Sequence, residues 1–292
     1  MTDRPAWLKV KAHTASEAAG MRTVRDILSR YKLTTVCQGA RCPNAAECWG
    51  AGTATFMLLG SVCTRACRFC AVPTGNPHGK IDEDEPARLA DAIADLGLDY
   101  VVLTSVDRDD LEDGGAGLFA AAISQIKKRS PKTKIEALIP DFSGSDGALR
   151  TLIDSSPDVI GHNIETVRRL SPALRDPRAG YDLSLRVLSH VVQISPHTIT
   201  KSSLMLGLGE KEDEVIETLR DLRSVGVRAL TLGQYLPPSR DAAPLVSYIQ
   251  PDQFASLELK ARDLGFCFVM SGPLVRSSYR AERTISACSD QS

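Results

Sequence analysis

The chain reads TATFMLLGSVCTRACRFC from Thr53 to Cys70. Its first part, Ala54–Leu59, is a short apolar run, which predicts a buried strand. Its second part is a loop that carries three cysteines in the spacing C-x3-C-x2-C. Three thiols therefore follow directly on a strand, at the end where a parallel sheet gathers its ligands.

After this first strand, short apolar runs alternate with helical patterns. The expected strands are Ala54–Leu59, Tyr100–Thr104, Lys134–Ile139, Asp158–Gly161, Ser202–Leu206, Ala229–Leu232 and Cys267–Met270. The expected helices are Pro86–Leu96, Leu118–Arg129, Leu183–Gln193, Glu212–Val225 and Pro251–Leu264. Gly97, Gly226 and Gly265 stand where a helix stops. This alternation predicts an α/β fold with a parallel sheet, arranged as a closed or partial barrel or as an open doubly wound sheet.

The chain divides into three parts by pattern. Residues 1–52 are rich in Gly, Cys, Ala and Asn and, apart from a helical stretch near Glu17–Tyr31, show little periodicity. We expect an irregular, cysteine-rich N-terminal extension (1–52), a βα-repeat domain (53–270) and a C-terminal segment (271–292) with the motif Arg276-Ser277-Ser278-Tyr279.

The bulk composition is that of an ordinary globular domain. Of the 292 residues, 43% are hydrophobic and 24% charged, and the formal net charge is -1. So small a charge gives no electrostatic reason to expect nucleic acid or a membrane surface as a partner. No run approaches the roughly 18 apolar residues of a membrane helix. The start of the chain lacks a signal-peptide core, and we expect a cytoplasmic protein.

Eight cysteines are the unusual count, and six of them lie between Cys37 and Cys70. In a reducing compartment clustered cysteines more often hold metal than form disulfides. Three thiolates on the loop Cys63–Cys70 can hold three irons of a four-iron cluster and leave the fourth iron open. The alternative, structural zinc, requires four ligands, and the nearest histidine is His78.

The other triplet, Cys37, Cys42 and Cys48, has the spacing C-x4-C-x5-C. It offers three more thiolates on a Gly- and Pro-containing loop that can wrap around a cluster. The alternative is three unconnected thiols in a flexible extension, which fits poorly with three cysteines in twelve residues beside a second triplet.

A C-x3-C-x2-C loop after the first strand of a βα-repeat domain resembles the radical S-adenosylmethionine (SAM) superfamily. The resemblance implies a partial (β/α)6-type barrel and a [4Fe-4S] cluster on Cys63, Cys67 and Cys70 whose open iron binds SAM. It also implies that Phe69 lines the adenine pocket, which is compatible with simple core packing. In that superfamily the cluster reduces SAM to a 5′-deoxyadenosyl radical, which removes hydrogen from unactivated C–H bonds.

The two triplets together resemble the lipoyl synthase family in particular. The further matching segments are Thr104–Asp110, His162–Val167, Lys201–Glu210, Leu232–Leu236 and Arg276–Tyr279. One departure is Asp241-Ala242-Ala243, where the family often has a histidine after Pro-Ser-Arg, and we assign these residues no catalytic role. The rivals are another sulfur-inserting radical SAM enzyme, such as a biotin synthase or methylthiotransferase, and a non-enzymatic iron–sulfur or zinc protein.

The family resemblance implies insertion of two sulfur atoms at carbons 6 and 8 of a protein-bound octanoyl-lysine. A second [4Fe-4S] cluster on Cys37, Cys42 and Cys48 would donate the sulfur, with a serine as fourth ligand. We favour Ser278 over Ser277. The implied partners are octanoylated lipoyl domains of a 2-oxoacid dehydrogenase E2 or a glycine cleavage H protein, a ferredoxin or flavodoxin as electron donor, and an iron–sulfur carrier for cluster repair.

Several polar residues have two interpretations from sequence. Asn163 and Glu165 follow the fourth expected strand and could bind SAM, or could cap a helix. His162 is more often a satisfied polar residue than a ligand. Arg68 is expected to be a surface or structural residue rather than a catalyst. Asp107, Asp109 and Asp110 could form a divalent metal site, but a solvated acidic loop is the commoner meaning of such a run. Cys267 is expected to be a buried apolar residue, and Cys288 a free thiol in the polar tail.

Overall fold

The computed structural model describes residues 4–8, 15–39 and 42–289. Eight strands form one sheet in chain order, β1 to β8, and all neighbours are parallel except β1 and β2. The strands are β1 (Thr34–Thr35), β2 (Thr53–Leu58), β3 (Tyr100–Ser105), β4 (Lys134–Leu138), β5 (Val159–Gly161), β6 (Ile199–Leu206), β7 (Ala229–Gln234) and β8 (Phe268–Gly272). Every expected strand and the partial parallel barrel are thereby confirmed.

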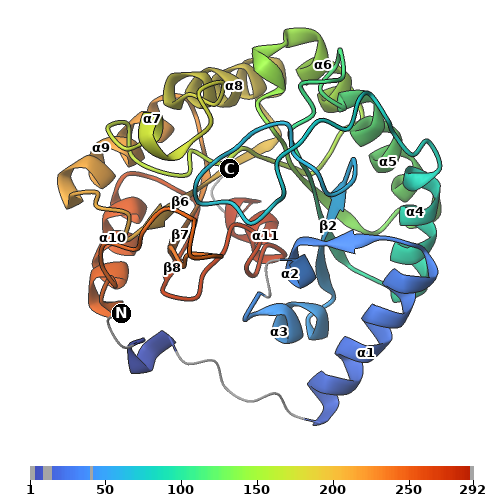
Figure 1. Cartoon of the computed structure of the whole chain (residues 1–292), viewed down its shortest axis with the longest axis horizontal. Coiled ribbons are helices and arrows are strands. Elements are labelled where there is room, and N and C mark those ends of the chain that lie inside the picture. The colour runs from blue at the N-terminus through green and yellow to red at the C-terminus, as the bar shows by residue number, and fades with distance from the viewer. Residues whose placement is uncertain (1–3, 9–14, 40–41, 290–292) are drawn as a thin grey trace.

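The helices surround the sheet (Figure 1). The longer ones are α1 (Ala15–Arg30), α4 (Glu85–Leu96), α5 (Ala116–Arg129), α6 (Asp146–Asp154), α8 (Tyr181–Ile194), α9 (Glu212–Ser224) and α10 (Pro251–Asp263). The shorter ones are α2 (Val36–Gly39), α3 (Ala45–Gly50), α7 (Ser171–Leu174) and α11 (Arg283–Ser289), and two 3-10 turns cover Ala6–Leu8 and Phe142–Gly144. The five helices expected in the repeat domain are all present.

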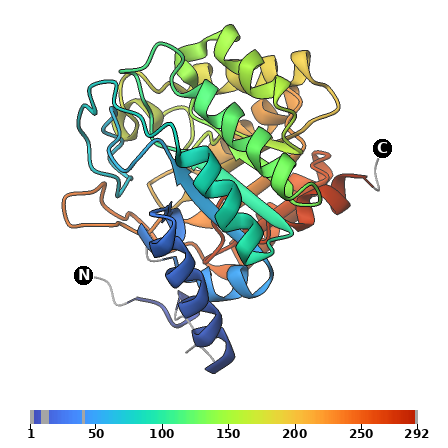
Figure 2. The same cartoon turned by 90° about the vertical axis from the view of Figure 1, so that its right-hand side faces the viewer.

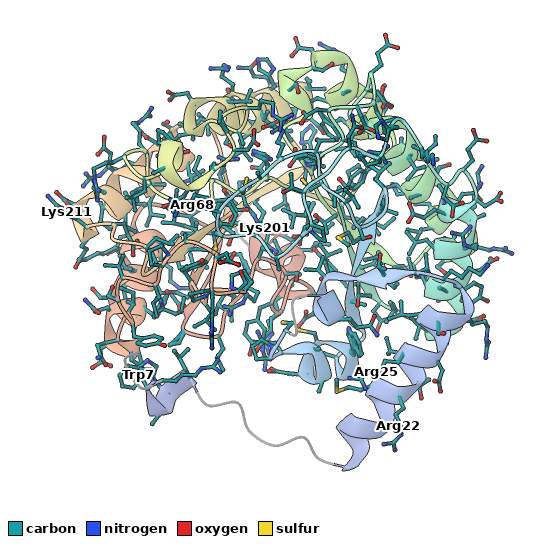
Figure 3. All side chains as sticks on the ribbon, in the orientation of Figure 1. Trp7, Arg22, Arg25, Arg68, Lys201 and Lys211 are labelled. Carbon is teal, nitrogen blue, oxygen red and sulfur yellow. A yellow bond between two sulfur atoms is a disulfide. The ribbon has the colours of Figure 1, made fainter. Side chains whose placement is uncertain are left out.

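Strand order equals chain order because each helix returns the chain to the next parallel position. The central strands are buried on both faces: every residue of β7 is buried, and all but one of β6. One buried ion pair crosses the barrel interior, where Lys201 Nζ of β6 lies 2.9 Å from both carboxylate oxygens of Glu136 in β4. Lys201 accordingly lies within the ring of helices in Figure 3.

The N-terminal extension contains more helix than the sequence indicated. Val24, Ile27 and Leu28 lie on one side of α1 and pack into the core cluster that also contains Trp49 of α3. Figure 2 shows α1 running alongside α4. The first strand of the extension, β1, adds to the edge of β2 in antiparallel register. Part of the extension is therefore an integral layer of the barrel wall.

The C-terminal segment closes the end of the barrel where the strands begin. Helix α11 places Ile285 and Cys288 against Val159, Ala229 and Phe268. Cys288 is 1% exposed and is disulfide-bonded to Cys267. The expectation that Cys288 is a free thiol in the tail is wrong, because α11 turns this side of the tail onto the core.

No helix in the described part of the chain is long and apolar enough to span a bilayer.

Candidate functional site

The loop that follows β2 places Cys63, Cys67 and Cys70 at one cavity of about 190 Å³. The other walls come from the residues that follow the next three strands. These lining residues include Ser105 at the end of β3 and Asp107 after it, Ile139 and Asp141 after β4, and His162, Asn163 and Glu165 after β5. The cavity therefore lies at the carboxyl ends of the parallel strands, where such folds bind ligands.

Each sulfur of this triplet accepts one backbone N–H. Arg65 N lies 3.4 Å from Cys63 Sγ, Asp176 N lies 3.3 Å from Cys67 Sγ, and Val72 N lies 3.4 Å from Cys70 Sγ. Burial raises the pKa of the Cys63 and Cys67 thiols to about 11. Such thiols are neutral without a cation, whereas iron would displace their protons and the N–H groups would then stabilise the thiolates. The donor set therefore fits an iron–sulfur cluster.

A buried guanidinium anchors the triplet loop to the strands. Arg65, 4% exposed, donates at 2.6 and 2.8 Å to Asp141, which follows β4. It also donates at 2.8 Å to Asp109 and lies 3.3 Å from Asp107, both after β3. Burial raises the pKa of the Asp107 carboxyl to about 6, against the opposing effect of Arg65. One cation facing three carboxylates holds three loops together.

The expectation of a solvated acidic loop over Asp107–Asp110 holds only for exposure at Asp109, since all three carboxylates form ion pairs with arginines. Asp109 faces Arg65, and Asp110 accepts from Arg108 at 2.7 Å, where the Arg108 side chain is itself 1% exposed. The sequence of an acidic segment does not show which arginines its carboxylates will pair with, whether the arginine is distant, like Arg65, or two residues away, like Arg108. Arg68, by contrast, is exposed, as expected.

His162 is a satisfied buried residue, as the sequence indicated. Its Nδ1 lies 2.9 Å from Ile139 O and its Nε2 2.8 Å from Ser184 Oγ. Burial lowers the pKa of this imidazole to about 4, so that the ring is neutral at pH 7.

Asn163 and Glu165 line the cavity, and the alternative that they cap a helix is wrong. Glu165 forms a parallel bridge with Leu204 of β6, and its φ of 68° is left-handed, so that the chain turns sharply here. Burial raises the pKa of the Glu165 carboxyl, while Arg175 and Asn163 act in the opposite direction.

Arg175 is a lining residue that sequence reasoning missed. It is 8% exposed, and its Nη1 donates at 2.8 Å to Ser184 Oγ, but its buried Nε has no partner. Ser105 Oγ, which also lines the cavity, is likewise buried and unpartnered. Buried polar groups are nearly always paired, so these atoms point to a polar ligand that the cavity accepts. Arg175 lies between α7 and α8, with no sequence signal to mark it.

Phe69 fits both interpretations made from sequence. It lines the cavity and packs beside the apolar cluster of Leu174, Leu208, Tyr235 and Ala243. Ala243 itself donates its N–H to Arg68 O at 2.7 Å, and its carbonyl accepts from the Tyr235 hydroxyl at 2.7 Å. The segment Asp241–Ala243 therefore contributes packing against the cysteine loop.

The first triplet lines a second, smaller cavity of about 10 Å³. Cys37 belongs to α2, Cys48 belongs to α3, and Cys42 lies between them; Ser278 and Arg276 complete the wall from the C-terminal segment. Burial raises the pKa of Cys48 to about 12 and also raises that of Cys42. Three thiols and one hydroxyl suit iron chemically, so this donor set fits a second iron–sulfur cluster.

Among residues 4–8, 15–39 and 42–289, no three His, Cys, Asp or Glu side chains converge closely enough to hold a single metal ion. Zinc ligands converge on one ion at about 2.0–2.3 Å. The ligands of an iron–sulfur cluster bind separate irons and stand further apart.

Comparisons with known proteins agree on one family. The sequence profile of the Radical SAM superfamily matches residues 57–222. A lipoyl synthase of Thermus thermophilus is 54% identical over 96% of this chain and 86% of its own length. A lipoyl synthase of Pyrobaculum arsenaticum is 54% identical over 97% of this chain and 95% of its own.

Solved structures share the fold at low identity. The crystal structure of methylornithine synthase superposes with a TM-score of 0.55 at 14% identity, over 85% of this chain and 81% of that one. Streptococcus suis SuiB bound to its precursor peptide superposes with a TM-score of 0.59 at 10% identity, over 92% of this chain and 57% of that one.

Proposed function

Because this chain belongs to the lipoyl synthase family of the radical SAM superfamily, we propose that it inserts two sulfur atoms at carbons 6 and 8 of an octanoyl chain bound to a carrier lysine. The observation that carries the proposal is the pair of cysteine triplets, which line two separate cavities of one barrel. A biotin synthase, a methylthiotransferase or a non-enzymatic metal protein would not account for both the family match and the second triplet.

At the larger cavity, Cys63, Cys67 and Cys70 are proposed to hold three irons of a [4Fe-4S] cluster. With SAM bound, this cofactor pair supplies the 5′-deoxyadenosyl radical. The protein's own contribution is to fix the cysteine loop in place and to stabilise the negative charge of its thiolates. Arg65 fixes the loop through Asp109 and Asp141, and the three backbone N–H groups offset charge on the sulfurs.

SAM itself is proposed to bind along the wall that carries Arg175, Glu165 and Asn163. Its methionine part offers a carboxylate and an ammonium group. The unpartnered Nε of Arg175 suits the carboxylate, while Glu165 and Asn163 suit the ammonium or ribose hydroxyls. Phe69 offers an apolar surface for the adenine.

Replacing Arg175 with Met is expected to weaken SAM binding about 10- to 100-fold, the value of a buried charged hydrogen bond. Anaerobic calorimetric titration of SAM into the reconstituted protein measures it. The control is Arg169→Met, an exposed arginine paired with Glu214. Circular dichroism must show both variants folded, since Arg175 also contacts Ser184. Equal affinity for Arg175→Met and the wild type would remove Arg175 from the SAM site.

At the smaller cavity, Cys37, Cys42, Cys48 and Ser278 are proposed to hold a second [4Fe-4S] cluster, which is the sulfur source. A serine oxygen is a harder donor than a thiolate and binds iron–sulfur clusters less well. A fourth ligand of this kind can leave more easily than a cysteine. Ser278 lines the cavity, whereas Ser277 is not among the described residues that do.

Ser278→Ala is expected to lower lipoyl formation at least about tenfold and leave reductive SAM cleavage intact, because the larger cavity is untouched. Ser277→Ala, the matched control one residue away, is expected to be milder. Both products are measured by mass spectrometry under anaerobic conditions, as 5′-deoxyadenosine and as lipoyl peptide. A greater loss for Ser277→Ala would move the ligand assignment to Ser277.

Octanoylated lipoyl carrier domains follow as substrates from the family. We propose the E2 component of a 2-oxoacid dehydrogenase or the glycine cleavage H protein as the carrier. A ferredoxin or flavodoxin would donate electrons, and an iron–sulfur carrier would rebuild the second cluster after turnover.

A further inference from the structure

The segment that carries Ser278 is tied to α3 through one carboxylate, Glu47. The Tyr279 hydroxyl lies 3.1 and 3.2 Å from the two carboxylate oxygens of Glu47. The Arg280 guanidinium donates to the same carboxylate through Nη2, and its Nε lies 3.3 Å from the Tyr279 hydroxyl. These three side chains form a clasp between two segments that are far apart in the chain: Glu47 and Tyr279 are separated by 232 residues.

The clasp lies next to the proposed iron ligands on both sides. Glu47 directly precedes Cys48, and Tyr279 directly follows Ser278. The backbone of Arg280 lies beside the Cys48 thiol and lowers its pKa, against the larger effect of burial. Behind the clasp, the buried Asn44 side chain donates to Leu274 O at 2.7 Å. The Ser278 hydroxyl and the thiols are therefore fixed relative to each other by contacts from both segments.

The backbone conformation at Arg280 indicates that contacts to α3 stabilise the segment that carries Ser278. Arg280 has a φ of 50°, in the left-handed region that a residue with a side chain adopts at a cost. Its side chain donates to Glu47 of α3, and its backbone lies beside Cys48 of the same helix. The contacts to α3 thus offset the conformational cost at Arg280, and without them we expect the segment to adopt other conformations.

We propose that Glu47 is a positioning residue, which holds Ser278 beside Cys37, Cys42 and Cys48 by gripping Tyr279 and Arg280. The inference rests on the proposed second cluster, whose ligand set it explains. The side chains of Glu47 and Arg280 are 43% and 33% exposed. An exposed ion pair of this kind adds little to overall stability, so its effect is local. Removing the clasp should free the Ser278 segment without unfolding the barrel.

The test compares full-length, reconstituted wild type with Glu47→Ala and with the control Glu83→Ala, which removes an exposed glutamate before α4. Two readouts are independent of turnover. Hydrogen–deuterium exchange over residues 276–282 is expected to be about tenfold faster in Glu47→Ala alone. Iron loss from the second cluster to a chelator is expected to be about 10- to 100-fold faster. Reductive SAM cleavage should stay at the wild-type rate.

A charge-swapped double variant gives the rescue. Glu47→Arg with Arg280→Glu should restore slow exchange, whereas either single swap should not, because only the pair reforms the salt bridge. Salt at 1 M, where the Debye length is about 3 Å, should speed exchange in the wild type and not in Glu47→Ala.

The outcomes separate this inference from the function on which it rests. Wild-type exchange and iron retention in Glu47→Ala would overturn the clasp. A wild-type protein with only about four irons would overturn the second cluster instead. The exchange measurement would still decide whether Glu47 holds the segment.

Discussion

Replacing Cys63, Cys67 and Cys70 together with alanine is expected to reduce reductive cleavage of SAM by at least about a thousandfold, because the cofactor that supplies the electron loses all its protein ligands. The measurement is 5′-deoxyadenosine release under dithionite, with the octanoyl peptide present. Lipoyl product should fall to background with it, since no hydrogen is then removed from the chain.

The same variant must remain folded for this result to count. The three cysteines lie on a loop, two of them half-buried and Cys70 exposed, while the barrel core beneath consists of other residues. Far-UV circular dichroism and the iron retained at the other triplet provide the control. Undiminished 5′-deoxyadenosine release would mean that radical generation does not depend on this loop.

Replacing Cys37, Cys42 and Cys48 together with alanine is expected to abolish sulfur insertion but to preserve SAM cleavage. Lipoyl product should fall at least about a thousandfold, while SAM cleavage stays within about twofold of the wild type. The reason is separation: the two triplets line different cavities, and they share no lining residue. Mass spectrometry of the carrier peptide should show octanoyl without added sulfur, because a carbon radical that finds no sulfur returns to octanoyl by recovering a hydrogen atom.

The matched control for this second variant is the disulfide pair. Cys267 and Cys288 lie at the opposite end of the barrel from the larger cavity, and replacing both with alanine should leave sulfur insertion in place. Lipoyl formation by the variant that lacks Cys37, Cys42 and Cys48 would show that the sulfur comes from another source.

The fold could be predicted because its signals are local. Each strand of the repeat domain is an apolar run followed by a polar segment, and helix stops such as Gly97, in the left-handed conformation at φ 60°, are single-residue features. The short helix α6 was missed, although Ser145 caps it by accepting the N–H of Ala148 at 3.3 Å. A serine directly before a helix is a local signal of this kind.

The cysteines of the candidate site could be found for the same reason, since their spacing is written in two short loops. Arg65 and Arg175 could not be assigned roles. Arg65 is explained only by Asp109 and Asp141, which lie 44 and 76 residues away. Arg175 is explained only by the cavity that it lines.

The disulfide shows a third limit, namely that a cysteine's partner depends on tertiary contact. Cys288 stands in a largely polar tail, where Ile285 and Ala287 are too short an apolar pattern to predict a buried helix. The structure buries it because α11 folds beneath the barrel onto Cys267 and Phe268.

Anaerobic analysis of iron, acid-labile sulfide and zinc in the reconstituted wild type and the two triple-cysteine variants tests the central claim most directly. The account predicts about eight irons with matching sulfide in the wild type, about four of each in either variant, and no zinc. Zinc without sulfide, or about four irons in the wild type that persist when Cys37, Cys42 and Cys48 are replaced, would contradict the claim that this chain carries two iron–sulfur clusters.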